Sequence, residues 1–407
     1  MSSQTFAPLD RSLALVMVGL PARGKTYVAR KVAHFLRWRG YNARVFNVGQ
    51  YRRERVGASV SHAFFDPLNS EGLEARRQVA HEALDDLLTW MSEGGQVGIY
   101  DATNSTRTRR QWVKRRFQNA GVQVLWIEIV CDDPEQLDAN IRETKLSSPD
   151  YAHTDAEQAM ADFRARIAHY EQAYEPVEED EGPMVRQVDA GRQLTVREVQ
   201  GYLPSLLVNW ILNLHLVPRP IYLTRHGESV HNHLGLIGGD PPLTQAGREY
   251  ARALGLWLGE RETQPVVWTS TLQRTHQTAA FLPWSSLQVR ALDEIDAGTC
   301  DGLTYEQVAR RMPDEFEARQ ADKLRYRYPR GESYEDVILR VEPIIFELER
   351  QRGSVIVIAH QAVLRTLYAY LAGRSRQDCP HLDLPLHTVI RLVPRAYGCH
   401  EERFVLG

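Results

Sequence analysis

The sequence predicts an α/β protein of two domains, and three features lead to this prediction. Short apolar strands alternate with helical segments, and the alternation restarts near residue 221 after two prolines. The length of 407 residues also exceeds the ~150 residues typical of one domain. Such alternation is typical of a parallel sheet with helices on both faces. We therefore expect domains at residues 1–217 and 218–407.

Each element of the first half is expected from its own pattern. The first strand is a short, continuously apolar run that ends at a glycine, and the later strands are similar runs between turn residues. The helical segments are longer and mix apolar with polar positions. We expect strands at residues 12–20, 43–48, 96–102 and 122–130, helices at about 25–39, 71–92, 106–119, 155–174 and 198–214, and an acidic surface loop at 175–183.

The second half repeats the alternation with different sequences, so the two domains are not a duplication. The prolines before residue 221 end the preceding helix pattern, and a new strand begins there. We expect strands at residues 220–224, 265–270 and 354–360 and helices near 244–258, 271–282, 333–351 and 361–371.

Composition limits the class of protein. Apolar residues make up 43% of the chain, enough for more than one buried core. The net charge of −3 argues against a general nucleic-acid binder, which needs a strongly basic surface. Signal-peptide character and runs of ~20 apolar residues are both absent, so we expect neither secretion nor membrane insertion. Four cysteines without CxxC spacing predict free thiols in a reducing cytoplasm: Cys131, Cys300, Cys379 and Cys399.

Residues 19–26 read GLPARGKT and match the phosphate-binding pattern G-x-x-x-x-G-K-[ST]. Gly19 and Gly24 let the loop curl, so that its backbone N–H groups and the next helix N-terminus face a phosphate. Lys25 is expected to reach the outer phosphates, and the Thr26 hydroxyl to ligate Mg²⁺. The alternative, a plain glycine turn, leaves the Lys-Thr pair unexplained. We therefore predict nucleotide binding.

A second set of polar residues follows strands that neighbour this loop. Asp101 ends an apolar strand, where it would orient an acceptor hydroxyl or hold Mg²⁺ through water. Any single arginine nearby is more simply a solvated surface charge. Together the arginines favour an acceptor that carries its own phosphate, because Arg binds phosphate bidentately. The arginines are Arg52, Arg53, Arg76, Arg77 and Arg109, and Thr103 lies on the same loop as Asp101.

The second half contains a candidate nucleophile. His226 lies in RHGE directly after a strand, where a neutral imidazole can attack phosphorus and become a phosphohistidine. Arg225, Arg274 and His360 are placed to stabilise the transferred phosphoryl group. Glu294, in LDEIDAG, is the candidate acid for the leaving alkoxide.

Other histidines receive a structural interpretation. A lone histidine at a strand end is more often a hydrogen-bonded structural residue, and no Cys/His group has convincing zinc spacing. These histidines are His231, His233, His276, His381 and His387.

Taken together, these motifs resemble the bifunctional 6-phosphofructo-2-kinase/fructose-2,6-bisphosphatase family from about residue 13 to 406. The matching segments are GLPARGKTY, FNVGQYRR, EGLEARRQ, DATNSTRTRR, SPDY, RHGES, IGGDPPLT, WTSTLQRTHQTA, EIDAGTCDGLTYE, YRYPRGESYEDV, AHQAVLR and PLHTV. The resemblance implies two three-layer domains. The first would be a P-loop kinase of adenylate-kinase-like fold, and the second a histidine phosphatase of the phosphoglycerate-mutase-like superfamily.

For the kinase, the resemblance implies binding of MgATP, with Mg²⁺ the only cofactor and no prosthetic group. The implied ATP contacts are Gly19, Leu20, Pro21, Ala22, Arg23, Gly24, Lys25, Thr26, Tyr27 and Asn140. The implied fructose 6-phosphate contacts are Arg52, Arg76, Thr103, Arg109, Lys145, Arg166 and Tyr170. Asp101 and Cys131 match active-site positions of the family, although phosphoryl transfer to a hydroxyl needs positioning and charge neutralisation more than a thiol.

For the phosphatase, the resemblance implies that His226 takes the 2-phosphoryl group of fructose 2,6-bisphosphate and that Glu294 is the acid. The implied contacts to the bisphosphate are Arg225, Asn232, Gly238, Tyr305, Arg319, Lys323, Tyr334, Gln361 and Arg365. Family members commonly pair through the kinase domain, so we expect a homodimer with no nucleic-acid or membrane partner.

Two departures from the family pattern qualify these expectations. Leu236 stands where the family usually has Arg, which removes a cation near the phosphatase mouth. The chain also lacks the longer terminal extensions through which animal members are regulated, so we expect little control by phosphorylation.

Three alternatives to a bifunctional enzyme are considered. In the first, only one domain is active, with the phosphatase the preferred candidate. The presence of both complete catalytic sets in the sequence disfavours this alternative. A kinase/phosphatase acting on nucleic-acid ends is disfavoured by the net charge. A non-catalytic sensor is disfavoured by the presence of Lys25, His226 and Glu294.

Overall fold

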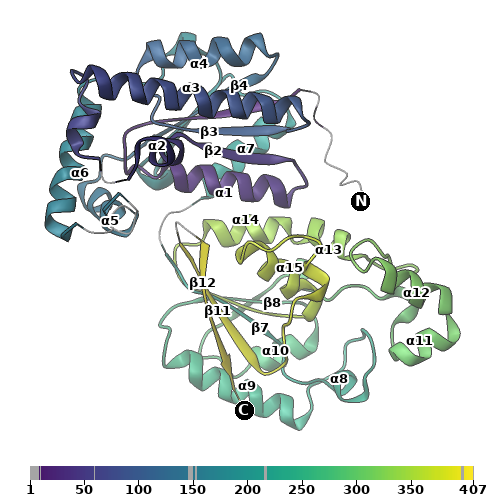
Figure 1. Cartoon of the computed structure of the whole chain (residues 1–407). Coiled ribbons are helices and arrows are strands. Elements are labelled where there is room, and N and C mark those ends of the chain that lie inside the picture. Colours follow the sequence, from purple (N-terminus) through teal and green to yellow (C-terminus); the bar gives the residue numbers. More distant parts are fainter. Residues whose placement is uncertain are drawn as a thin grey trace. The chain divides into compact units, whose positions relative to one another are not determined.

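The computed structural model describes residues 9, 11–58, 60–144, 150–151, 154–214, 218–395 and 398–406. The chain divides into two compact units, Met1–Leu216 (unit 1) and Val217–Gly407 (unit 2), each an α/β domain with its own sheet (Figure 1). The predicted fold class of two α/β domains is confirmed. No helix among the described residues is long and apolar enough to cross a membrane.

Unit 1 is built on a six-stranded sheet in the order β2-β3-β1-β4-β5-β6. Its strands are β1 (Leu13–Val18), β2 (Ala43–Asn47), β3 (Val97–Asp101), β4 (Gln123–Val130), β5 (Met184–Val188) and β6 (Gln193–Arg197). The first five run parallel, and β6 is antiparallel to β5. The buried side chains of β1 supply the centre of the sheet on both faces.

Helices cover both faces of this sheet, as expected (Figure 1). They are α1 (Lys25–Trp38), α2 (Val48–Val56), α3 (Ser70–Ser92), α4 (Arg107–Asn119), α5 (Pro134–Thr144), α6 (Ala156–Glu171) and α7 (Tyr202–Asn213), with 3-10 turns η1 (His62–Phe65), η2 (Glu179–Glu181) and η3 (Asp189–Gly191). One face packs against α3 and α4 around Tyr100 and Trp126. On the other face α1 meets α7, where Phe35 stacks on Trp210 with ring centroids 5.1 Å apart.

Two sequence expectations for unit 1 need correction. The helix expected at 198–214 begins only at Tyr202. The segment before it, residues 193–197, pairs with β5 as strand β6. The acidic stretch 175–183 is not simply a surface loop. Its Glu181 is buried, and both carboxylate oxygens accept 2.7 Å hydrogen bonds from the buried Arg110.

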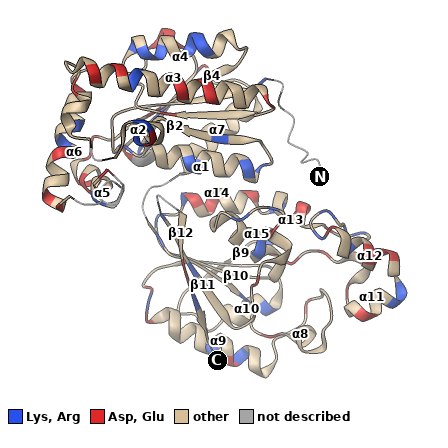
Figure 2. Ribbon diagram, in the orientation of Figure 1, with Lys and Arg blue, Asp and Glu red and all other residues tan. Residues whose placement is uncertain are grey.

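The basic helix α4 shows why a low net charge and local basic helices coexist (Figure 2). It carries six Lys and Arg residues and no acidic one. Three of its arginines are paired with carboxylates of other segments, Arg107 with Asp180, Arg110 with Glu181 and Arg116 with Asp85. Helix α4 therefore does not present an unpaired basic stripe of the kind that binds nucleic acid.

Unit 2 has a six-stranded sheet in the order β12-β11-β7-β10-β8-β9. The strands are β7 (Ile221–Arg225), β8 (Val266–Thr269), β9 (Ser286–Gln288), β10 (Val355–Ala359), β11 (Thr388–Arg395) and β12 (Gly398–Val405). Strands β7, β10, β8 and β9 run parallel, whereas β11 is antiparallel to β7 and to β12. The sequence patterns predicted neither β9 nor this antiparallel edge.

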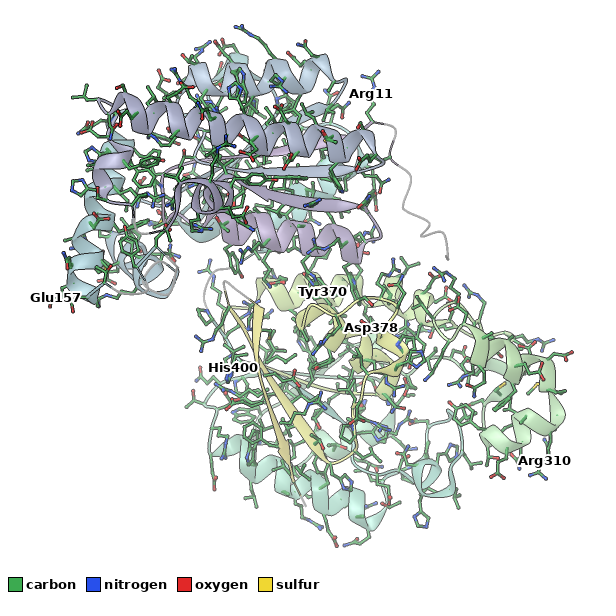
Figure 3. The ribbon with its side chains drawn as sticks, viewed as in Figure 1. Arg11, Glu157, Arg310, Tyr370, Asp378 and His400 are labelled. Carbon is green, nitrogen blue, oxygen red and sulfur yellow. The ribbon has the colours of Figure 1, made fainter. Side chains whose placement is uncertain are left out.

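Helices again lie on both faces of the unit 2 sheet (Figure 1). They are α8 (Val230–Leu234), α9 (Gln245–Gly259), α10 (Gln273–Ala279), α11 (Tyr305–Arg311), α12 (Pro313–Ala321), α13 (Tyr334–Arg340), α14 (Glu342–Arg350) and α15 (Gln361–Leu371). The helix expected at 333–351 is two helices that meet at Val341. Tyr370 of α15 lies inside the unit and donates to Glu349 at 3.0 Å, whereas Arg310 of α11 points into solvent (Figure 3).

Candidate active sites

The phosphate-binding loop of unit 1 joins β1 to α1, as its sequence requires. Gly19 has φ 134°, and a Cβ there would lie 2.3 Å from the carbonyl oxygen of Ile129, so only glycine fits. The Gly19 N–H donates to the carbonyl of Thr103 at 3.0 Å, which ties the loop to the segment after β3. Lys25 opens α1, and its buried ammonium donates to the Leu20 carbonyl at 2.5 Å. The loop thus curls around the lysine at the positive end of a helix, the arrangement that binds phosphate.

Two further predicted nucleotide contacts connect this loop to helices α5 and α6. The Asn140 side chain on α5 donates to the Ala22 carbonyl at 3.1 Å. Arg23 is buried and donates to Glu171 of α6 at 3.3 Å. Helices α5 and α6 therefore form the side of the loop away from the sheet.

Asp101 lies at the end of β3, where the sequence places it, and is 3% exposed. Its carboxylate accepts a hydrogen bond from Asn47, which is its register partner at the end of β2. Asn47 also caps α2 by accepting from the Gln50 N–H at 2.8 Å. The sequence reasoning did not identify Asn47, although its position at the end of a neighbouring parallel strand was a usable signal.

A cluster of cations surrounds Asp150. This buried carboxylate lies 2.6 Å from Arg52, 3.6 Å from Arg166 and 4.0 Å from Arg53. The Arg166 guanidinium also stacks on Phe65, 3.6 Å from the ring centroid. One carboxylate cannot neutralise three arginines, so the cluster keeps a positive excess that suits an anionic ligand.

The other predicted sugar-phosphate contacts are placed unequally. Tyr170 lies beside Phe65, with ring centroids 6.0 Å apart, and Arg76 donates to the Phe65 carbonyl at 3.2 Å. Arg109 is turned elsewhere, because it donates to the Tyr100 hydroxyl at 2.7 Å and stacks on Trp112. Lys145 lies outside the described residues.

Cys131 follows β4 and is 3% exposed. Burial raises the pKa of its thiol, so the thiolate needed for nucleophilic attack is disfavoured. This environment suits a packing role near the nucleotide loop.

The residues present fit a magnesium ion that arrives with a nucleotide. Thr26 supplies a hydroxyl at the second position of α1, and Asp101 supplies a carboxylate on an adjoining strand; both are the hard oxygen ligands that Mg²⁺ prefers. Within the described part of the chain, no three His, Cys, Asp or Glu residues form a metal-binding group.

His226 lies directly after β7 and is buried in unit 2. Its Nδ1 is 2.7 Å from the carbonyl oxygen of Gly227, which only accepts, so Nδ1 carries the proton. Its Nε2 is therefore the unprotonated nitrogen, and it accepts from Arg274 Nε at 3.0 Å. Burial, together with Arg274, lowers the pKa of His226 well below its ordinary value. The imidazole is thus neutral at pH 7, the state that a nucleophile needs.

Cations close the site around His226. Arg274 on α10 is buried, and its second contact is the Gly239 carbonyl at 2.7 Å. Arg225 donates to the Leu384 carbonyl at 3.2 Å, and its pKa is lowered by burial. Both arginines therefore lie where a transferred phosphoryl group needs positive charge.

His360 and Glu294 meet at the start of α15. The His360 ring centroid is 5.0 Å from that of His226. The Glu294 carboxylate accepts from the N–H groups of Gln361 and Ala362, each at 3.1 Å. The helix N-terminus thus holds the carboxylate in place beside the nucleophile.

The remaining predicted phosphatase residues include a second positive group, the sugar-phosphate cluster of Arg319, Lys323 and Arg365. Arg319 donates to the hydroxyls of Tyr305 at 3.1 Å and Tyr328 at 2.9 Å, and Arg365 donates to that of Tyr334 at 3.1 Å. Arg365 and Arg319 act electrostatically on Lys323, which shows that the three cations are neighbours. Three cations framed by tyrosines suit a phosphorylated sugar.

Two residues near the mouth have local structural roles. The Asn232 side chain caps α8 by accepting from the N–H and hydroxyl of Ser229. Gly238 has φ 67°, and a Cβ there would lie 1.7 Å from Asp301 Oδ1. Leu236 pairs with Thr304 in an isolated β-bridge.

Several residues in these sites were not predicted from sequence. Ser270 lies 2.7 Å from His360 Nε2, Asp150 organises the arginines of unit 1, and Thr278 accepts from the Gly227 N–H at 3.0 Å. His387, which received a structural interpretation, accepts from the Glu228 N–H at 3.3 Å and stacks on Tyr250. The only available signal was that these residues lie inside the motifs WTSTLQRTHQTA, SPDY and PLHTV.

Comparison with known proteins covers nearly the whole chain. The family model for 6-phosphofructo-2-kinase matches residues 2–218, and the model for the histidine phosphatase superfamily (branch 1) matches residues 221–406. A solved structure described as a putative alpha-ribazole-5'-P phosphatase from Escherichia coli aligns with 46% of this chain and 96% of its own at 24% identity, but its TM-score of 0.42 is too low to add to the assignment.

Curated relatives match over both units. A relative from Arabidopsis thaliana, named 6-phosphofructo-2-kinase/fructose-2,6-bisphosphatase, is 50% identical over 98% of this chain and 54% of its own length. A relative of the same name from Gallus gallus is 47% identical over 97% of this chain and 84% of its own. One from Pongo abelii, with the same name followed by the number 3, is 46% identical over 97% and 77%. The chain therefore spans about half of the plant relative and more than three quarters of the two animal relatives.

Proposed function

The chain belongs to the 6-phosphofructo-2-kinase/fructose-2,6-bisphosphatase family, and from this premise we propose that it carries both activities. Unit 1 makes fructose 2,6-bisphosphate from ATP and fructose 6-phosphate, and unit 2 hydrolyses the 2-phosphate of that product. The ratio of the two rates sets the level of a sugar bisphosphate signal for glycolysis and gluconeogenesis. The kinase domain spans residues 1–217, and the phosphatase domain spans 218–407.

In the kinase, the loop of residues 19–27 binds the ATP phosphates, and Lys25 neutralises charge on the transferred group. Thr26 and Asp101 would hold the Mg²⁺ that comes with ATP, which would supply positive charge to the phosphates. Asp101 also accepts the proton of the 2-hydroxyl of fructose 6-phosphate. Asn47 holds its carboxylate in place for this step.

The acceptor sugar binds at the cluster around Asp150. Arg52 and Arg166 take its phosphate, with Tyr170 and Arg76 beside them. Thr103, Lys145 and Arg109 complete the proposed set. Arg109 donates to the Tyr100 hydroxyl at 2.7 Å, so it has to turn to contact the sugar. Cys131 has no covalent role.

In the phosphatase, Nε2 of His226 attacks the 2-phosphorus, and the bond to the sugar oxygen breaks. Arg225, Arg274 and His360 stabilise the phosphoryl oxygens, and Glu294 gives its proton to the leaving alkoxide. Water then attacks the phosphohistidine, with Glu294 taking up a proton, and phosphate leaves. The 6-phosphate is held by the sugar-phosphate cluster, with the other proposed contacts at Asn232, Gly238, Tyr305, Tyr334 and Gln361.

Other parts of the proposal concern the assembled protein. The enzyme pairs as a homodimer, binds neither nucleic acid nor membrane, and resides in the cytoplasm. The four free cysteines support a reducing location.

The observation that carries the proposal is the state of His226, a buried neutral imidazole with its Nε2 directed to Arg274, in the same chain as a P-loop lysine. Lys25→Ala is expected to abolish synthesis of fructose 2,6-bisphosphate and to leave its hydrolysis. His226→Ala is expected to do the reverse. Arg30→Ala on the exposed side of α1 and His233→Ala on α8 are matched controls that should keep both activities. Both activities surviving in both site variants would contradict the proposal.

A further inference from the structure

Ser270 is a buried hydroxyl that contacts His360, one of the two histidines of the phosphatase site. It follows the last residue of β8, and both Ser270 and His360 are 0% exposed. The Ser270 Oγ lies 2.7 Å from His360 Nε2. Both residues are shielded from bulk water, so their polar atoms depend on partners within the protein.

The neighbours of Ser270 limit where its proton can go. Its oxygen accepts from the Leu272 N–H at 3.1 Å. Thr275 Oγ1 lies 3.0 Å away, and its own proton goes to the Leu272 carbonyl at 2.8 Å. The Ser270 proton is therefore directed either to Thr275 Oγ1 or to His360 Nε2, and the contact with His360 is the shorter one.

The other ring nitrogen of His360 is unpaired. Nδ1 is buried and has no hydrogen-bond partner among the described residues. The ring lies 5.0 Å from that of His226, where the phosphoryl group would be transferred. Because Ser270 occupies Nε2, Nδ1 is the nitrogen that remains to serve a ligand. An unpaired buried polar atom is unfavourable, and a bound phosphoryl oxygen would give Nδ1 the partner it lacks.

The protonation state decides whether Nδ1 helps or hinders. Burial, and then the charge of Arg274, lower the pKa of His360 well below its ordinary value, so the free ring is neutral and carries one proton. A proton on Nε2 would leave a lone pair on Nδ1 facing the phosphoryl oxygens. A proton on Nδ1 offers them a donor.

We propose that Ser270 is a positioning residue of the phosphatase reaction: its hydroxyl donates to His360 Nε2 and so keeps the imidazole proton on Nδ1, where it donates to the phosphoryl group. This inference rests on the proposed phosphatase function. Ser270 itself does not touch the reacting atoms. It acts through the tautomer of His360, as the carboxylate of a catalytic triad acts through its histidine.

The kinetic test compares Ser270→Ala with Thr275→Val, which removes the adjacent buried hydroxyl and leaves the Ser270–His360 contact. At pH 7.5 we expect kcat for fructose 2,6-bisphosphate hydrolysis to fall about tenfold to a hundredfold in Ser270→Ala, below the loss for a donor that touches the oxyanion directly. The deficit should persist from pH 7.5 to pH 6, because the lowered pKa of His360 keeps its ring neutral across this range. Thr275→Val should stay within about threefold of wild type, and kinase activity should be unchanged in both variants. No loss in Ser270→Ala, or an equal loss in Thr275→Val, overturns the inference.

A second measurement reads the tautomer directly and needs no substrate. In the ¹⁵N spectrum of the histidine-labelled full chain, assigned with a His360→Gln variant, we expect a protonated Nδ1 and an unprotonated Nε2 for His360. A protonated Nε2 in the neutral ring overturns the inference. If the wild-type chain hydrolyses no fructose 2,6-bisphosphate, the proposed function fails instead, and the spectrum still decides the tautomer.

Discussion

The charge state of Lys323 should control the phosphatase in the alkaline range. Its ammonium donates to the Pro380 carbonyl at 2.8 Å and lies 6.0 Å from the centre of the Tyr334 ring. Burial, followed by the nearby charges of Arg365 and Arg319, lowers the pKa of Lys323 to about 8. A sugar phosphate that binds here places a negative charge next to the ammonium and so favours the charged form of Lys323.

The size of the effect follows from this pKa. Binding favours the charged lysine, so affinity is retained below pH 8 and lost as pH rises through it. With a pKa near 8, about 90% of the lysine is charged at pH 7 and about 10% at pH 9. The value of kcat/KM reports the free enzyme, so it should fall roughly tenfold between these two pH values if only the charged form binds.

The assay is kcat/KM for hydrolysis of fructose 2,6-bisphosphate from pH 6.5 to 9.5 at constant ionic strength. The matched control is Lys323→Arg, because Arg stays charged throughout this range. The wild type should show a midpoint near pH 8, and the variant should lack that midpoint. A wild-type profile that is flat through pH 8, or a Lys323→Arg profile that falls with the same midpoint, would refute the reasoning.

Three further predictions concern other groups. Glu294→Gln should lower the rate of hydrolysis by about 10²–10⁴-fold and spare the kinase. The control is Glu228→Gln, which should have a small effect in the same assay, because the Glu228 carboxylate accepts a hydrogen bond from Thr244. Equal losses would argue against Glu294 as the acid. Because burial lowers the pKa of His226, the imidazole stays neutral below pH 6.5. The rate of phosphoenzyme formation in rapid-quench experiments should therefore not fall between pH 7.5 and 6. A fall with its midpoint near 6.5 would show that the pKa of His226 is that of an ordinary histidine. Arg110→Met should destabilise unit 1 by about 3–5 kcal/mol in urea unfolding, because it leaves Glu181 buried and unpaired. Adding Glu181→Leu should restore part of this loss of stability. An unchanged unfolding midpoint in the single variant would show that the ion pair does not stabilise unit 1.

Local patterns were sufficient for the central strands and their helices. The apolar runs of β1, β3, β7 and β10 are buried along their length or nearly so, and this is the condition under which a continuous apolar run identifies a strand. Strand β6 was not predicted, because it lies at an edge of the sheet and has only exposed and half-buried side chains. Its pairing with β5 comes from tertiary contact, which a local pattern does not report.

The candidate sites divide in a similar way. His226 and Lys25 were identified because each lies in a short motif at a strand end, where a parallel sheet gathers its ligands. Ser270 and Asp150 were not, because their roles depend on partners about 90 or more residues away, His360 and Arg52. The environment of Glu181 was predicted wrongly for the same reason. Its acidic neighbours suggested an exposed loop, and its buried partner Arg110 lies far away in the sequence.

The central claim, that one chain makes and then removes the 2-phosphate through His226, is tested most directly by trapping the phosphoenzyme. The full chain is mixed with fructose 2,6-bisphosphate labelled at the 2-phosphate, quenched in base within milliseconds, and the labelled peptide is mapped. We expect acid-labile label on the peptide that contains His226, at up to one phosphate per chain, and none in His226→Ala. Continued hydrolysis by the wild type with no labelled histidine, or with label on another residue, would contradict the account.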